Sequence, residues 1–169
     1  MLGYDGRVAD EPWLSAEEQQ AWRAFTEMRH ILERHLERHL QREFGLSDPD
    51  FEILVNLSES PKGRLRAFEL GGATQWEKSR MSHHLSRMEK RGLIRRKASG
   101  ARYPDIVLTK AGRDAIEASA PANAVRVRRF FIDILGPDRL AMLREAADDV
   151  LAAIEEHQQR DCPPEISGC

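Results

Sequence analysis

TQWEKSRMSHHLSRMEKRGLIRRKASGARYPDIVLT, residues 74–109, is the stretch from which the fold can best be predicted. The stretch reads as a helix with a basic, polar outer face, then a short strand, a basic turn and a second strand. Met81, Leu85 and Met88 recur at helical spacing and should face a core. This order of elements predicts a winged helix-turn-helix, which places one helix in a groove of DNA and a β-hairpin beside it.

Capping signals predict where the helices begin. Ser15–Glu18 and Thr74–Glu77 both have the spacing of a capping box, in which two residues satisfy each other's free backbone N–H groups. The sequence therefore predicts a first helix over about 16–43 that ends near Gly45, and a second helix from Ser47 with Pro49 in its first turn. A short third helix is expected over Arg66–Gly71, with Phe68 and Leu70 facing inward. The basic helix should begin after Thr74. Gly71-Gly72 is expected to break the third helix.

The remaining elements complete a mainly α fold with a small β-wing. Short strands are expected at Leu93–Lys97 and Asp105–Leu108, with a single-residue edge pairing at Leu65. A long helix should follow Thr109 and be kinked or split at Pro121, and Gly136-Pro137-Asp138 should separate a last helix. We expect a winged helix-turn-helix domain over 46–109, a helical dimerisation region over 15–45 and 110–158, and flexible arms over 1–14 and 159–169.

Charge is distributed very unevenly along the 169 residues. The net charge is only −2, but the segment 62–113 contains 14 Lys and Arg against 4 Asp and Glu, so it carries +10 and the remainder −12. This asymmetry indicates a basic lobe that faces a polyanion, rather than a solvated surface that happens to be basic.

Several classes of protein are excluded by what the sequence lacks. It has no apolar run long enough for a membrane span, and no secretory signal is recognisable. Its only cysteines, Cys162 and Cys169, lie in the tail, so a disulfide scaffold is not expected. Together these features favour a location in the cytoplasm, on the nucleoid. It has no glycine-rich phosphate loop, nucleophile elbow or paired-carboxylate motif, so neither an enzyme nor a cofactor is expected.

The basic helix supplies the candidate DNA-reading residues. Arg80 is the best candidate for a bidentate contact to guanine, and its alternative role is an ion pair with Glu77 or Glu69. The other candidate contacts to bases or phosphates on this helix are Lys78, Ser79, Ser82, His83 and Arg87. On the wing, Arg102 is expected to enter the minor groove, with Arg96 and Lys97 on nearby phosphates.

These motifs resemble the MarR (multiple antibiotic resistance regulator) family of bacterial transcription factors. The resemblance rests on GLIRR at 92–96, VLTKAGR at 107–113 and, above all, WEKSRMSHHLSRMEKRGLI at 76–94, and it covers about residues 15–158. It implies a repressor that binds a pseudo-palindromic operator in double-stranded DNA and is released by a small-molecule effector. The family's wing usually carries Asp-x-Arg; here Gly100 stands at the Asp position, and Arg102 is kept.

The resemblance also implies a homodimer formed through the N- and C-terminal helices. The apolar residues expected in that interface are Phe25, Met28, Leu32, Phe130, Phe131, Leu140, Leu143, Leu151 and Ile154. The family's effector pocket lies beside the first helix, which makes Trp22 the candidate for its lining, although ordinary core or interface packing is the favoured explanation for Trp22, Trp13 and Trp76.

Two alternatives compete with this interpretation. The basic lobe could hold an acidic protein partner instead of DNA. Alternatively, His35 and His39 lie at i, i+4 on the first helix and could gate a metal-sensing regulator, although two histidines are an incomplete site and a solvated face explains them well. A redox switch at Cys162 and Cys169 is disfavoured, because a tail offers no fixed environment for a thiolate.

Overall fold

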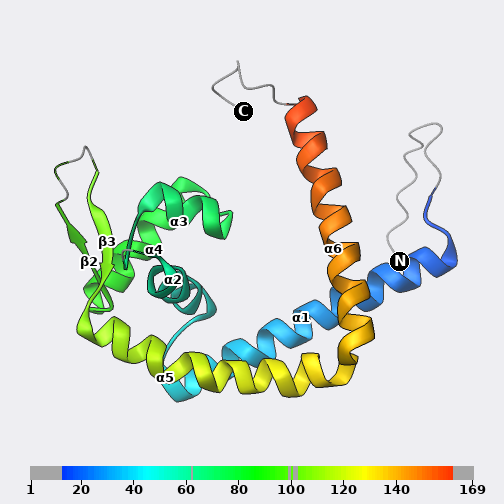
Figure 1. Ribbon diagram of the computed structural model, residues 1–169, viewed down its shortest axis with the longest axis horizontal. Helices are drawn as coiled ribbons and strands as arrows, with labels where there is room; N and C mark the ends of the chain where they lie inside the picture. Colours follow the sequence, from blue (N-terminus) through cyan, green and yellow to red (C-terminus); the bar gives the residue numbers. More distant parts are fainter. Residues whose placement is uncertain (1–12, 62, 99, 101–102, 162–169) are drawn as a thin grey trace, which may run out of the picture.

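The computed structural model describes residues 13–161 apart from 62, 99 and 101–102, and it confirms a mainly helical winged helix-turn-helix (Figure 1). Its elements in chain order are α1 (Ala16–Phe44), α2 (Asp48–Glu59), β1 (Arg64–Arg66), α3 (Ala67–Thr74), α4 (Lys78–Lys90), β2 (Ile94–Lys97), β3 (Asp105–Leu108), α5 (Lys110–Val127), a π-helical turn η1 (Arg128–Ile132) and α6 (Asp133–Asp161). None of the described helices is both long and apolar enough to cross a bilayer.

One hydrophobic core fixes α4 against the rest of the winged helix-turn-helix, α2 to β3. Met81, Leu85 and Met88 are buried as their spacing predicts, and they pack with Ile53 and Leu57 of α2 and with residues of α3, β2, β3 and α5. Because the whole inner stripe of α4 is buried, its polar stripe must face outward.

The wing is a three-stranded antiparallel sheet in the order β1-β3-β2. The expected single-residue pairing at Leu65 is wrong, because all three residues of β1 pair with β3, from Arg64 opposite Val107 to Arg66 opposite Asp105. Leu65 packs against the core, and both flanking arginines reach the buried Asp105, at 3.3 and 3.9 Å. These long-range contacts stabilise a strand too short to be recognised from its sequence.

The junction between α3 and α4 also differs from the sequence-based expectation. Thr74 does not cap α4: it is the buried last residue of α3, and its hydroxyl donates to the Leu70 carbonyl at 2.8 Å. Gln75, at φ 55°, ends α3 in the left-handed conformation, and α4 begins at Lys78 without a side-chain cap. Gly71-Gly72 lies within α3, because burial of Leu70 offsets a helix-propensity cost of about 1 kcal/mol per glycine.

Two further expectations about helix composition need correction. Phe68 of α3 was expected to point inward but is 66% exposed. Pro121 does not split α5, which continues to Val127 and passes into η1.

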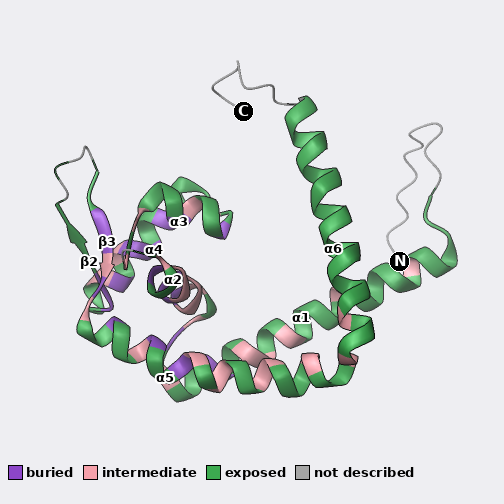
Figure 2. Cartoon of the chain, in the orientation of Figure 1, coloured by how far each residue is buried: buried purple, intermediate pink, exposed green. Residues whose placement is uncertain are grey.

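The predicted break before the last helix is confirmed at Gly136, whose φ of 70° and ψ of 173° are not helical. Beyond this residue the chain turns sharply away from α5, and α6 extends as an isolated arm (Figure 1). Figure 2 shows that its upper part is exposed on all sides. Residues 159–161, expected in a flexible arm, continue α6, while Cys162 and Cys169 lie outside the described residues.

Candidate DNA-binding site

The exposed face of α4 gathers six of the predicted DNA contacts on one surface. Lys78, Ser79, Arg80, Ser82, His83 and Arg87 are all exposed. The helix presents three cationic side chains among its first ten residues and no acidic residue in its first turn. A surface of this kind suits the phosphate backbone and the acceptor groups of the major groove.

Arg80 is held by an aromatic ring rather than by a carboxylate. Its guanidinium lies 4.1 Å from the centre of the Trp76 ring, in place of the ion pair with Glu77 or Glu69 considered from sequence. Trp76 is itself half-buried against the core. A cation–π contact restricts the guanidinium while leaving its N–H groups free to donate.

Below this surface lies a charged network that the sequence interpretation missed. Asp50, at the start of α2, is only 2% exposed, and it accepts hydrogen bonds from His84 Nε2 at 3.0 Å and from Arg91 at 2.5 Å. His84 Nδ1 in turn accepts from Arg87 at 2.7 Å. The one available signal was helical period: residue 84 falls on the inner stripe with Met81, Leu85 and Met88.

Hydrogen bonding keeps Asp50 ionised in this network. Burial acts to raise the pKa of Asp50, but hydrogen bonds from Ser47 and Arg91 outweigh it, and the pKa is lowered. The pKa of His84 is also lowered, first by burial and then by the charges of Arg87 and Arg80, against the opposing effect of Asp50. The network therefore pairs a carboxylate with a neutral imidazole.

The cations of the wing differ in how free they are to contact DNA. Lys97, at the end of β2, is exposed, whereas Arg96 is bound by the Glu89 carboxylate and reaches Ser86 of α4 at 3.3 Å. Gly100 has a φ of 73°, which explains a glycine where the family usually has Asp. Arg102, the predicted minor-groove residue, lies outside the described residues.

Sequence reasoning also overlooked three cations of the sheet. Arg64 and Arg66 of β1 share the carboxylate of Asp105, which leaves an excess positive charge beside the wing, and Arg95 of β2 is exposed. Recognising β1 depends on its pairing with β3, so no local signal marks Arg64 and Arg66 as part of the surface. Arg95, by contrast, lies in the strand that the sequence did predict.

The residues expected in a dimer interface form apolar stripes on α1, η1 and α6. They are exposed or half-buried in the single chain: Phe25, Met28, Leu32, Phe130, Phe131, Leu140, Leu143, Leu151 and Ile154. Exposed apolar surface of this extent typically marks an interaction site.

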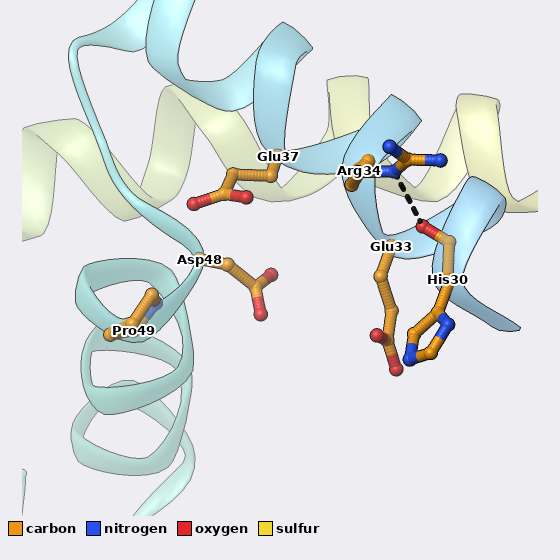
Figure 3. Close-up of a pocket in the computed structure, with 6 residues that line it drawn as sticks. All are labelled: His30, Glu33, Arg34, Glu37, Asp48 and Pro49. Atoms are coloured by element: carbon orange, nitrogen blue, oxygen red, sulfur yellow. Dashed lines mark hydrogen bonds between the residues drawn. The ribbon is translucent and has the colours of Figure 1, made fainter. Parts of the chain in front are cut away.

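A cleft of about 460 Å³ lies between α1 and the start of α2 (Figure 3). It is lined by His30, Glu33, Arg34, Glu37, Asp48 and Pro49. The lining combines three carboxylates with His30 and Arg34, and burial together with the nearby carboxylates of Glu37 and Glu33 raises the pKa of Asp48. Trp22 is not among these residues: it is 59% exposed and packs against Phe25.

His35 and His39 are not part of a recognisable metal site. Among the described residues, no group of three or more His, Cys, Asp or Glu side chains could hold an ion. His35 packs against the Phe130 ring and His39 lies 2.8 Å from Glu43, so both take part in the packing of α1.

Comparisons with solved structures give close matches over most of the chain. AbsC, a MarR family transcriptional regulator from Streptomyces coelicolor, matches with a TM-score of 0.81 and 39% identity over 86% of this chain and 99% of AbsC. Sco3205, a MarR family regulator from the same organism solved in complex with DNA, matches with a TM-score of 0.81 and 34% identity over 94% of this chain and 97% of Sco3205.

A more distant structure shares the fold alone. The S. aureus MepR–DNA complex matches with a TM-score of 0.70 and 17% identity, over 78% of this chain and 96% of MepR. No protein-family model and no curated protein matches the sequence.

Proposed function

Because this chain belongs to the MarR family of DNA-binding transcriptional regulators, which are not enzymes, we propose that it represses transcription by binding a pseudo-palindromic operator as a homodimer. The observation that carries the proposal is the exposed basic face of α4 above a buried core, in a chain 34% identical to a regulator solved on DNA. It acts in the cytoplasm, on the nucleoid. Two copies of α4 would enter successive major grooves roughly 10 base pairs apart.

Selection from a randomised pool of duplexes tests sequence-specific binding. The protein should enrich an inverted repeat, and the complex should survive excess nonspecific competitor DNA. Footprinting should then show two protected major-groove segments on one face of the duplex. Failure to enrich any sequence at low salt would contradict the proposal and favour a module that holds an acidic protein. A reporter driven through the enriched repeat should be shut off by the protein, as repression requires.

The apolar stripes on α1 and α6 support the homodimer. A second copy of the same chain would bring identical stripes together about a two-fold axis, which buries them without any further partner. The unattached course of α6 in Figure 1 leaves room for this pairing. The acidic remainder of the chain would then lie away from the DNA phosphates.

An effector would bind in the cleft between α1 and α2. The three carboxylates of the lining outnumber its one arginine, Arg34, and so favour a cationic ligand. The α2 side of the cleft adjoins the lobe that holds α4. A panel of organic cations should include compounds that release the selected duplex, and Glu37→Gln should weaken that release. Release by anionic compounds alone, unaffected by Glu37→Gln, would place the effector elsewhere.

A further inference from the structure

His84 uses its two ring nitrogens in opposite ways. Arg87 can only donate, so His84 Nδ1, 2.7 Å from that guanidinium, must be an acceptor without a proton. The proton of the neutral ring is then on Nε2, which donates to Asp50 at 3.0 Å. The geometry therefore specifies both the charge and the tautomer of a buried histidine on the DNA-reading helix.

Contacts extend from His84 to the exposed face of α4. The His84 and Trp76 rings pack edge to face, with their centres 5.3 Å apart. The Arg80 guanidinium lies over the Trp76 ring, 4.1 Å from its centre. Arg87 is bound directly. One buried imidazole therefore supports two cations that were identified independently as candidate DNA contacts.

Contacts also extend from His84 toward the dimerisation region. Asp50 binds Arg91, and the other terminal nitrogen of Arg91 donates to the Gly45 carbonyl at 2.6 Å. Gly45 is the C-cap of α1. The same network thus joins α4, the start of α2 and the end of α1.

We propose that His84 is a positioning residue which holds Arg87 in place for DNA, and that it does so only as a neutral imidazole. The proposal rests on the proposed function, since it concerns affinity for DNA. A proton on Nδ1 would remove the acceptor and place two positive charges at 2.7 Å, which would displace the Arg87 guanidinium. DNA affinity should therefore fall as His84 is protonated.

The charges around His84 distinguish this pH dependence of DNA affinity from that of an exposed histidine. Asp50 of α2 faces Nε2, Arg87 and Arg80 of α4 are the nearby cations, and Arg91 shares Asp50. The pKa of His84 is lowered, chiefly by burial, so His84 is protonated at a lower pH than an ordinary histidine. An exposed histidine beside phosphates, such as His83, would instead tighten binding when protonated. The two effects have opposite signs.

Two substitutions separate the two nitrogens. His84→Asn places an amide oxygen near the Nδ1 position and keeps an acceptor for Arg87, but it loses the donor to Asp50. His84→Gln places an amide nitrogen near the Nε2 position and keeps the donor, but it loses the acceptor. His157→Gln on α6 is the matched control, because it removes a histidine from a helix that lies apart from α4 (Figure 1).

The experiment measures the affinity of the full-length protein for the duplex selected by wild type, by fluorescence anisotropy from about pH 8 to about pH 5.5. Near pH 8, His84→Asn should bind within a few-fold of wild type, and His84→Gln should lose roughly tenfold, the loss expected for about 1.4 kcal/mol. Relative to His84→Asn, wild type should weaken as the pH falls, while His157→Gln follows wild type. Thermal melting and sedimentation at each pH show that the variants remain folded and associated.

A double-mutant cycle identifies the route of the effect. If His84 acts through Arg87, His84→Gln should cost much less in an Arg87→Gln background than in wild type. Three outcomes would each overturn the proposal. The two His84 variants could bind DNA equally well near pH 8, or the ratio of the wild-type affinity to the His84→Asn affinity could stay constant across the pH range. The losses in the double-mutant cycle could also be additive. Failure of wild type to select a duplex would instead contradict the proposed function.

Discussion

The Arg80 side chain is preorganised for DNA binding in the free protein. Its stacking on Trp76 limits the conformations of a long, flexible side chain, so less side-chain entropy is lost when the guanidinium binds a base. The ring leaves the planar donor edge available for the two acceptors of guanine.

Replacing Arg80 should therefore change specificity as well as affinity. Arg80→Ala should lower discrimination at one base pair of each half-site by roughly 1–3 kcal/mol. Binding measured on a set of duplexes, each substituted at a single position, would reveal this loss. Lys78→Ala is the matched comparison, since a phosphate contact should weaken all duplexes alike. Unchanged relative affinities for Arg80→Ala would contradict a base-reading role.

Asp50 should make folding stability dependent on pH under acidic conditions. Because the pKa of Asp50 is lowered in the folded state, the unfolded chain binds more protons between the folded and unfolded pKa values. The stabilisation is therefore complete above the ordinary Asp pKa of about 3.9 and is lost as the pH falls through the folded pKa.

Asp50→Asn should flatten this dependence. It should also destabilise the protein at neutral pH by roughly 1–3 kcal/mol, because Arg91 and His84 lose a charged acceptor while Arg91 stays partly solvated. Urea unfolding over a series of pH values measures both effects. Asp114→Asn, which removes an exposed pair with Lys110, should change little. An unchanged pH slope in Asp50→Asn would show that this carboxylate is not the titrating group.

At the scale of elements, the start of α5 is tightly fitted against the wing. Thr109 caps α5 through the Gly112 N–H and also donates to the Gly92 carbonyl at 2.6 Å. A Cβ on Gly112 would lie 2.0 Å from the Leu93 carbonyl oxygen. This close approach fixes the direction in which α5 leaves the DNA-binding lobe.

Gly112→Ala should destabilise the protein by roughly 2–4 kcal/mol, because backbone atoms rather than a flexible side chain must move. Gly72→Ala is its control: Gly72 is also helical, no neighbouring atom obstructs a Cβ there, and alanine should stabilise α3 by up to about 1 kcal/mol. Thermal melting of the two variants should give shifts of opposite sign. A neutral Gly112→Ala would show that β2 and α5 can separate freely.

At the scale of the whole molecule, association should control DNA binding. Leu151 lies on the apolar stripe of α6, and glutamate there would place a charge inside the proposed interface. Leu151→Glu should sediment as a monomer. It should bind the selected duplex far more weakly, with about half the wild-type slope of log affinity against log salt, since one lobe contacts half as many phosphates.

Ala152→Glu is the control for this experiment. It adds the same charge to α6 on the face away from Leu143, Leu151 and Ile154. The control should remain a dimer with the wild-type salt slope. A dimeric Leu151→Glu protein, or a monomer with full affinity, would contradict association through α6.

The sequence by itself determined the features that depend on neighbours within a few residues. The Ser15 capping box, the left-handed Gly45 that ends α1, the buried stripe of α4 and the break at Gly136 all follow from helical period or local hydrogen bonds. These signals were sufficient to place the basic helix and the wing in the right order. The family motifs then gave the class of function.

Only the tertiary structure decided the features that depend on distant partners. Thr74 has the spacing of a cap, yet burial of Leu70 keeps it in α3, and β1 exists because β3 lies beside it. His84 and Asp50 are 34 residues apart, so no local pattern pairs them. A buried polar group is stable only where packing supplies its partner, and this pairing links the DNA-reading helix to the start of α2.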